Sequence, residues 1–117
     1  PFNLRKATTD HWYDIALGTS DAHVAIDLVS RNNYIVVEVY INDKKELFDR
    51  LLSYRETIEK ELGFEMEWDR LDNKKASRIK YRIPGLDFDD HSNYDELMNH
   101  TIDIAVKMRD VFSSYMR

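Results

Sequence analysis

Hydrophobic and polar residues alternate along three short stretches in the first part of the chain, at residues 12–17, 23–29 and 34–41. Such alternation is typical of strands that bury one face. Residues 18–21 and 31–33 separate the stretches and favour turns. We therefore predict a three-stranded antiparallel meander with a one-sided core. The predicted inward side chains are Tyr13, Ile15, Leu17, Val24, Ile26, Leu28, Ile35, Val37, Val39 and Ile41.

The pattern changes to helical spacing between residues 43 and 62. Apolar side chains recur there at intervals of three, four and seven residues, which predicts one amphipathic helix. Asp43 and Glu46 predict a capping box at its start, and Gly63 predicts its end. The side chains on its predicted buried stripe are Leu47, Phe48, Leu51, Leu52, Ile58 and Leu62.

Residues 64–83 predict a β-hairpin that carries opposite charges on the outer side of its two strands. Acidic residues occupy alternate positions before the turn, and basic residues occupy alternate positions after it. Opposite charges that face each other across two strands help to fix the register, by roughly 0.2–1 kcal/mol per pair. A symmetric turn would pair Asp69 with Arg78, Glu67 with Lys80 and Glu65 with Arg82.

A last helix is predicted over residues 92–115, and its acidic start suits the helix dipole. The order of elements is then βββ-α-ββ-α, which indicates an α+β fold: a two-layer structure with a five-stranded antiparallel sheet and its helices on one face. We predict the strand order 1-2-3-5-4, because the first predicted helix can return the chain beside the third strand.

Composition narrows the class of protein. The chain has 117 residues, 43% of them hydrophobic and 33% charged, which predicts a single domain over residues 1–117 with one core. The lack of cysteine excludes disulfides, thiolate nucleophiles and cysteine-ligated metals. No apolar run is long enough to span a membrane and no signal peptide is visible, so we expect a cytoplasmic protein with no membrane partner. Because residue 1 is a proline and not a methionine, we expect the chain to be a piece of a longer protein.

Three carboxylates on predicted outward positions, Asp14, Asp27 and Glu38, are the best candidates for chemistry. A first turn centred on residues 20 and 21 would place Asp14 opposite Asp27. A second turn centred on residues 31 and 32 would place Glu38 diagonal to Asp27. Three such groups predict a site for Mg²⁺ or Mn²⁺, which prefer oxygen ligands, and hence a metal-dependent phosphodiesterase-like enzyme. The alternative is a charge ladder in which Glu38 lies beside the basic strand and each charge has a partner.

Other polar and aromatic residues offer two further hypotheses. Lys74 and Lys75 lie in the predicted hairpin turn and are candidates for nucleic-acid contact, although the net charge of −5 argues against a dedicated nucleic-acid binder. Trp12, Tyr34 and Tyr40 are expected on the outer sheet face, where exposed aromatic side chains mark a protein interface. The histidines have no metal-binding spacing and are expected at the surface; they are His11, His23, His91 and His100.

Several motifs resemble one bacterial and archaeal family, the domain of unknown function 4268. They are the segment W-x-R-L-x-x-K-K-A-S-R-I at residues 68–79, the Gly-x-Ser turn at residues 18–20, and IVVEVYINDKKELFDRL at residues 35–51. The resemblance is strongest over residues 11–83 and departs from the family pattern at Thr19, where an arginine is usual. It implies no established site residue. It does imply that the chain is the C-terminal part of a longer protein. Some members of the family have an upstream region that resembles the restriction-endonuclease nuclease fold.

The order of elements also resembles the fold of type III secretion chaperones, which is a likeness of fold alone. We therefore favour a non-catalytic interaction or regulatory domain that binds another protein or a fused domain, such as a nuclease-like one, or a second copy of the chain. This hypothesis requires no cofactor. The alternatives are a nucleic-acid-contacting accessory module and the metal-dependent enzyme.

Overall fold

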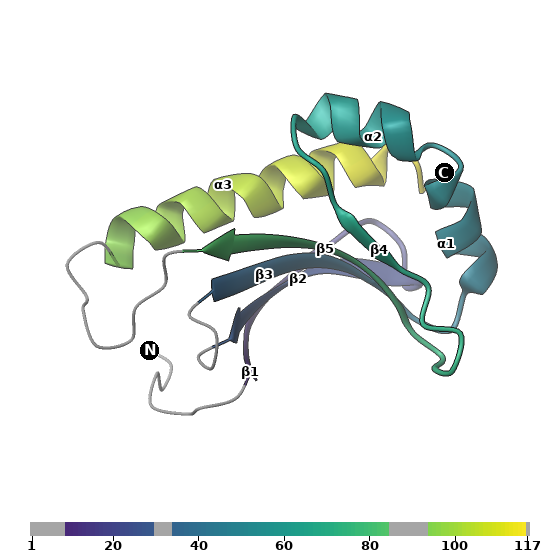
Figure 1. Cartoon of the computed structure of the whole chain (residues 1–117), viewed down its shortest axis with the longest axis horizontal. Helices are drawn as coiled ribbons and strands as arrows, with labels where there is room; N and C mark the ends of the chain where they lie inside the picture. The colour runs from purple at the N-terminus through teal and green to yellow at the C-terminus, as the bar shows by residue number, and fades with distance from the viewer. Residues whose placement is uncertain (1–8, 30–33, 85–93, 117) are drawn as a thin grey trace.

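The structure is a computed structural model that describes residues 9–29, 34–84 and 94–116. Within these residues, three helices lie on one side of a five-stranded sheet (Figure 1). The elements in chain order are β1 (Thr9–Ala16), β2 (Ala22–Val29), β3 (Tyr34–Ile41), α1 (Lys45–Leu52), α2 (Arg55–Leu62), β4 (Glu67–Asp69), β5 (Ser77–Pro84) and α3 (Tyr94–Ser113).

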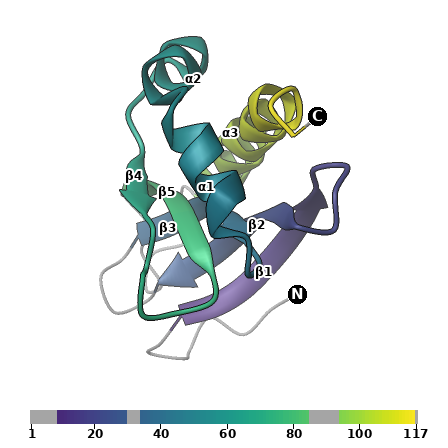
Figure 2. The same cartoon turned by 90° about the vertical axis from the view of Figure 1, so that its right-hand side faces the viewer.

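The strand order is β1-β2-β3-β5-β4, and every neighbouring pair is antiparallel. This confirms the predicted α+β class and the predicted order. The view along the sheet in Figure 2 shows α1 and α2 toward the β4 edge and α3 beside them, with all three helices on the same side. The other face of the sheet, which we call the outer face, carries no helix of the described part of the chain.

One cluster of buried side chains fills the space between the sheet and the helices. The predicted inward residues of β2 and β3 are completely buried, because strict alternation turns every second side chain toward the helices. From α3 the buried side chains follow the helical repeat. They are Met98, Thr101, Ile104, Ala105, Met108 and Phe112.

Two predictions about buried side chains were wrong. Tyr13 pairs with Ile26 on the helix side of the sheet but is 57% exposed, because β1 is an edge strand and the helices pack mainly over the strands inside it (Figure 2). Leu52 is 38% exposed because the helix ends there instead of continuing to residue 62.

The single helix predicted over residues 43–62 is in fact two helices. The backbone N–H of Tyr54 bonds the carbonyl oxygen of Leu51, which tightens the last turn of α1 and redirects the chain into α2. The predicted capping box is also wrong, since Lys44 is the N-cap and makes no capping side-chain bond. The predicted stop at Gly63 is confirmed, because this residue has the left-handed backbone conformation that glycine adopts without strain.

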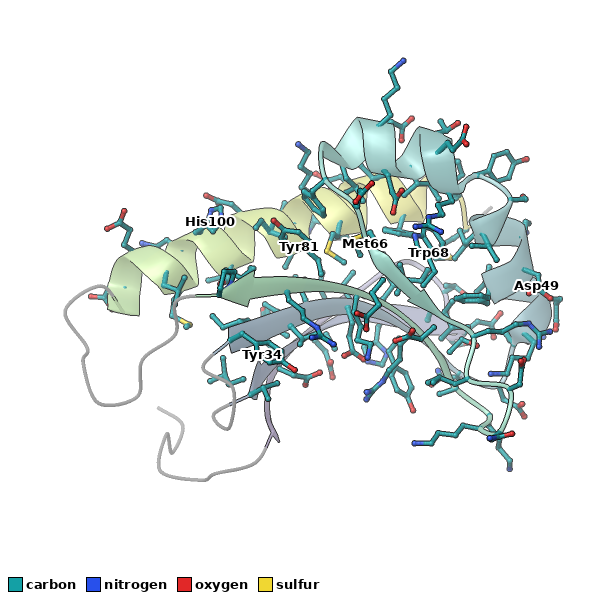
Figure 3. All side chains as sticks on the ribbon, viewed as in Figure 1. Tyr34, Asp49, Met66, Trp68, Tyr81 and His100 are labelled. Atoms are coloured by element: carbon teal, nitrogen blue, oxygen red, sulfur yellow. The ribbon has the colours of Figure 1, made fainter. Side chains whose placement is uncertain are left out.

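Two polar side chains from the helices hold the β4–β5 hairpin against the core. The Glu59 carboxylate accepts bonds from the Met66 backbone N–H at 2.7 Å and from the Trp68 indole N–H at 3.0 Å. The Lys45 ammonium donates to carbonyl oxygens across the hairpin, including that of Ala76 at 2.8 Å, and to the Ser77 hydroxyl at 2.9 Å. Figure 3 shows Met66 and Trp68 between the hairpin and the helices.

Burial acts to raise the pKa of Glu59, but the bonds from Met66 and Trp68 outweigh it and hold that pKa below its usual value. The glutamate is therefore ionised at neutral pH while it accepts both bonds. None of the helices within the described ranges is long and apolar enough to cross a membrane.

We predict that Trp68→Ala lowers the free energy of unfolding by about 3–5 kcal/mol, since it removes a large packed ring. The ring lies 6.2 Å from that of Phe48 and 6.4 Å from that of Phe112, measured between centroids. Trp68→Phe should keep most of the packing and lose mainly the bond to Glu59, at about 1 kcal/mol. Urea denaturation measures both variants. Equal effects of the two variants would contradict a packing role for the indole.

Candidate functional site

The outer face of the sheet carries most of the residues that the sequence singled out. It is built from the alternate side chains of each strand that point away from the helices. Among the described side chains the outer face includes Asp14, Ala16, His23, Ala25, Asp27, Val29, Tyr34, Val36, Glu38, Tyr40, Glu67, Asp69, Arg78, Lys80, Arg82 and Pro84. Figure 3 shows Tyr34 on this face, opposite the helices.

The prediction that Asp14 faces Asp27 was wrong. Asp14 pairs with Ala25, because the first turn is centred one residue earlier than predicted and the pairing therefore moves by two residues. A shift of two residues keeps Asp14 on the outer face. Nearer the start of β1, the pairing with β2 has an irregularity between His11 and Tyr13. Trp12 is the extra residue of this bulge. The side chain of Trp12 lies outside the described residues.

The structure does bring Asp27 and Glu38 together. Asp27 pairs with Val36, so Glu38 lies diagonal to it, as predicted. A side-chain hydrogen bond with Asp27 is one of the effects that raise the pKa of Glu38. Glu38 is only 2% exposed. Its Oε1 lies 3.1 Å from Arg78 Nε in an ion pair, yet it receives no hydrogen bond there.

Burial and the neighbouring Asp27 carboxyl raise the pKa of Glu38 from 4.5 to about 7, against the opposing effect of Arg78 and Lys80. A buried carboxylate loses its hydration, and a second carboxylate beside it adds repulsion. The nearby cations offset only part of that cost. Glu38 therefore exchanges its proton near neutral pH.

The basic side chains of β5 form a ladder with acidic neighbours on both sides. Glu67 pairs with Lys80 and Asp69 with Arg78 in the strand register, as predicted. Lys80 Nζ lies 3.0 Å from Asp69 and 3.4 Å from Glu67, and burial, which would lower its pKa, is outweighed by these carboxylates. Glu65 precedes the three-residue strand β4, and Arg82 instead contacts Glu67 at 3.4 Å. The charge-ladder alternative is thus confirmed for these groups.

Two outer-face tyrosines each carry an arginine above the ring. The guanidinium carbon of Arg78 lies 5.5 Å from the ring centroid of Tyr40, and that of Arg82 lies 5.2 Å from the ring centroid of Tyr34. These are cation–π distances, worth about 0.5–1 kcal/mol at exposed sites. Both tyrosines are half-buried. The outer face therefore presents aromatic and guanidinium groups that are already held in place.

His23 is the residue whose position the sequence analysis missed. Its Nε2 lies 3.4 Å from the Asp14 carboxylate, and its ring centroid lies 5.4 Å from that of Tyr40. The strand alternation that turns Val24 inward also turns His23 outward, so the signal was present. It was passed over because no second histidine follows at a metal-binding spacing.

Two shallow hollows lie side by side on the outer face, with volumes of about 300 and 350 Å³. Asp27, Glu38 and Arg78 border both of them. Tyr40 and His23 border only the larger of these two hollows. The carboxyl pair thus forms the boundary between the two hollows.

The predicted metal ligands are only partly assembled. Asp14 and Glu38 flank Ala25 from opposite strands and are not neighbours. Within the described residues no three histidine or acidic side chains lie close enough to hold a metal ion. A divalent cation would also need the ionised form of Glu38, which burial and the Asp27 carboxyl disfavour. The Mg²⁺ or Mn²⁺ site stays a prediction.

Lys74 and Lys75 are exposed in the β4–β5 turn. The turn is fixed by a bond from the Lys74 backbone N–H to the Leu71 carbonyl oxygen at 2.9 Å. It is also anchored by Arg70, whose guanidinium contacts the Asp49 carboxylate at 2.9 and 3.1 Å. The lysines therefore project from a rigid turn into solvent.

We predict that stability falls as the pH rises from about 5 to about 7. The unfolded chain loses the Glu38 proton early in this range, whereas the folded chain holds it until about pH 7. Glu38→Gln, which is neutral at every pH, should be more stable than the natural chain at pH 8, by an amount on the order of a few kcal/mol. Thermal unfolding at a series of pH values measures both effects.

Glu65→Gln, which changes an exposed glutamate in the same way, serves as the control and should leave the pH profile unchanged. A Glu38→Gln variant that is less stable than the natural chain at pH 8 would show that the ion pair with Arg78 outweighs the cost of burial.

Comparison with known proteins places the chain in a family without an assigned activity. Neither a search of curated proteins nor a search of solved structures found a match. The likeness to type III secretion chaperones therefore stays a prediction. One family model matches residues 1–116, which extends the similarity beyond residues 11–83 to include α3. The chain belongs to this family, which is described as Domain of unknown function (DUF4268).

Proposed function

We propose that this chain is a non-catalytic protein-interaction domain that binds a partner chain through the outer face of its sheet. The observation that carries the proposal is the pair of tyrosine–arginine stacks, Tyr40 with Arg78 and Tyr34 with Arg82, on a face that no described helix covers. Tyrosine and arginine are enriched among the residues that dominate protein interfaces.

The rigidity of this surface supports the same proposal. The side chains stand on paired strands, and ion pairs to β3 and β4 hold the cations of β5 in place. A surface that is ordered before binding loses less conformational entropy when a partner docks. The hollows on either side of the carboxyl pair offer places for partner side chains.

The proposed setting is the cytoplasm, and the proposed partner is a protein or a fused domain. The family resemblance favours a nuclease-like domain, since some members have such a region upstream. A second copy of the chain would be a partner of the same kind. Light scattering over a range of concentrations would distinguish self-association from binding to another protein.

We predict that peptides selected from a random display library against this domain bind the outer face. Tyr40→Ala should weaken the selected peptides by roughly tenfold or more, because it removes an aromatic anchor. Titration calorimetry of the selected peptides measures the effect. Tyr54→Ala is the matched control, since Tyr54 is an exposed tyrosine on the helix side of the molecule.

Equal losses in Tyr40→Ala and Tyr54→Ala, or selected peptides that lose affinity only in Tyr54→Ala, would contradict the proposal. Failure to select any peptide would also count against an interaction surface on this face.

Nucleic-acid contact is the second candidate function, favoured by the two exposed lysines in a rigid turn. If it holds, changing Lys74 and Lys75 to Glu should weaken DNA binding and reduce its dependence on salt. Fluorescence anisotropy with labelled DNA at low salt measures this. Lys60→Glu with Lys107→Glu is the control, because these exposed lysines lie on α2 and α3. Unchanged binding in the turn variant would exclude this contact.

A further inference from the structure

The larger hollow on the outer face is centred on a small side chain in a ring of titratable groups. Ala25 borders the hollow and is only 4% exposed. Asp14 and Glu38 stand beside it on the two neighbouring strands. His23 and Asp27 stand two residues away on β2 itself, so they share its face.

The ring carries more negative than positive charge. Three carboxyl groups, those of Asp14, Asp27 and Glu38, border the hollow, against one permanent cation, Arg78. His23 adds a positive charge only when it is protonated. Lys80 lies outside this hollow and contacts Asp69 and Glu67. A hollow with this balance of charge favours a cationic ligand.

An incompletely bonded oxygen adds an independent reason to expect a ligand. Glu38 Oε1 is buried and receives no hydrogen bond from the protein, even though Arg78 Nε is 3.1 Å away. Buried acceptors in folded proteins nearly always have a hydrogen-bond partner. Glu38 also borders the hollow.

We propose that this hollow binds the guanidinium group of an arginine side chain on the partner protein. The inference rests on the proposed function and specifies the chemistry that the outer face recognises. A guanidinium presents five N–H donors in a planar arrangement, so it can donate hydrogen bonds to carboxylates on opposite walls of the hollow at once. Asp14 lies on one wall and the pair of Asp27 and Glu38 on the other.

Arginine suits this site better than the other cations that carboxylates bind. A lysine ammonium is a compact, strongly hydrated charge that cannot reach both walls in the same way. A divalent metal needs several ligands around one point, and the described residues bring no three such groups together.

Binding should release a proton. A guanidinium favours the ionised form of Glu38, whose proton is held in the free protein by burial and by Asp27, against the effect of Arg78 and Lys80. Binding therefore becomes tighter as the pH rises through about 7, where Glu38 loses its proton.

The probe for the test is N-acetyl-arginine amide, added to isotopically labelled protein at pH 8 and followed by the backbone amide signals. We expect saturable shifts centred on Ala25, Asp27 and Glu38. N-acetyl-citrulline amide, a neutral analogue of nearly the same shape, should give none. The variant with Asp27→Asn and Glu38→Gln should bind the arginine probe at least about tenfold more weakly.

Glu67→Gln is the matched control, because it removes a carboxylate of the outer face that borders neither hollow. It should leave the affinity for the arginine probe unchanged. Equal binding of citrulline, shifts centred elsewhere, or unchanged affinity in the double variant would overturn the inference. Binding of Mn²⁺ at these amides without binding of the arginine probe would overturn it as well.

The peptide selection separates this inference from the proposed function. Peptides whose affinity depends on Tyr40 but not on Asp27 and Glu38 would retain the proposed function and refute the arginine site. If the arginine probe binds the hollow but no selected peptide binds the outer face, the arginine site is retained and the proposed function is refuted.

Discussion

The antiparallel pairing of β3 with β5 is the contact on which the rest of the structure depends. It joins the N-terminal meander to the hairpin that comes after the helices. On the helix side it places Ile79 beside Val39 and Ile83 beside Ile35, all of them buried. On the outer face the same pairing places the basic side chains of β5 next to Glu38. One register therefore sets both the core and the charge pattern, because a slip by a single residue would exchange the two faces.

The hairpin that supplies β5 has little sheet of its own to hold it, since β4 is three residues long. Polar contacts from the helices supply much of the anchoring. Glu59 binds the start of the hairpin, and Lys45 binds carbonyl oxygens near its turn and the buried Ser77 hydroxyl. Ser77 in turn donates to the Arg70 carbonyl oxygen. The segment at residues 68–79 that resembled the family thus has a structural role, because several of its residues hold the hairpin to α1.

Local periodicity was sufficient to predict several parts of the structure. Alternation fixed the faces of β2 and β3, and opposite charges together with a symmetric turn predicted the pairs of Glu67 with Lys80 and Asp69 with Arg78. Alternation and the predicted second turn also placed Glu38 diagonal to Asp27. Local periodicity could not predict the bulge at Trp12 or the centre of the first turn, because several turn geometries suit the residues around Gly18. The break between α1 and α2 was missed for a similar reason. The apolar stripe continues through the break, so the stripe does not reveal where α1 ends and α2, which packs against α3, begins.

The candidate site depended on both local pattern and tertiary register. The alternation of side chains along each strand was enough to assign each residue to the outer face. The ring around Ala25 arises only from the observed register, which places Asp14 and Glu38 on opposite sides of this small residue. A buried carboxyl beside a second carboxyl is a cost to the folded domain, as the raised pKa of Glu38 indicates. An apolar residue at position 38 would suit the centre of the sheet better. Local choices that oppose stability are expected mainly where function requires them. The unfavourable placement of Glu38 is therefore more informative about function than the well-paired charges around it, because those charges are already explained by the sheet.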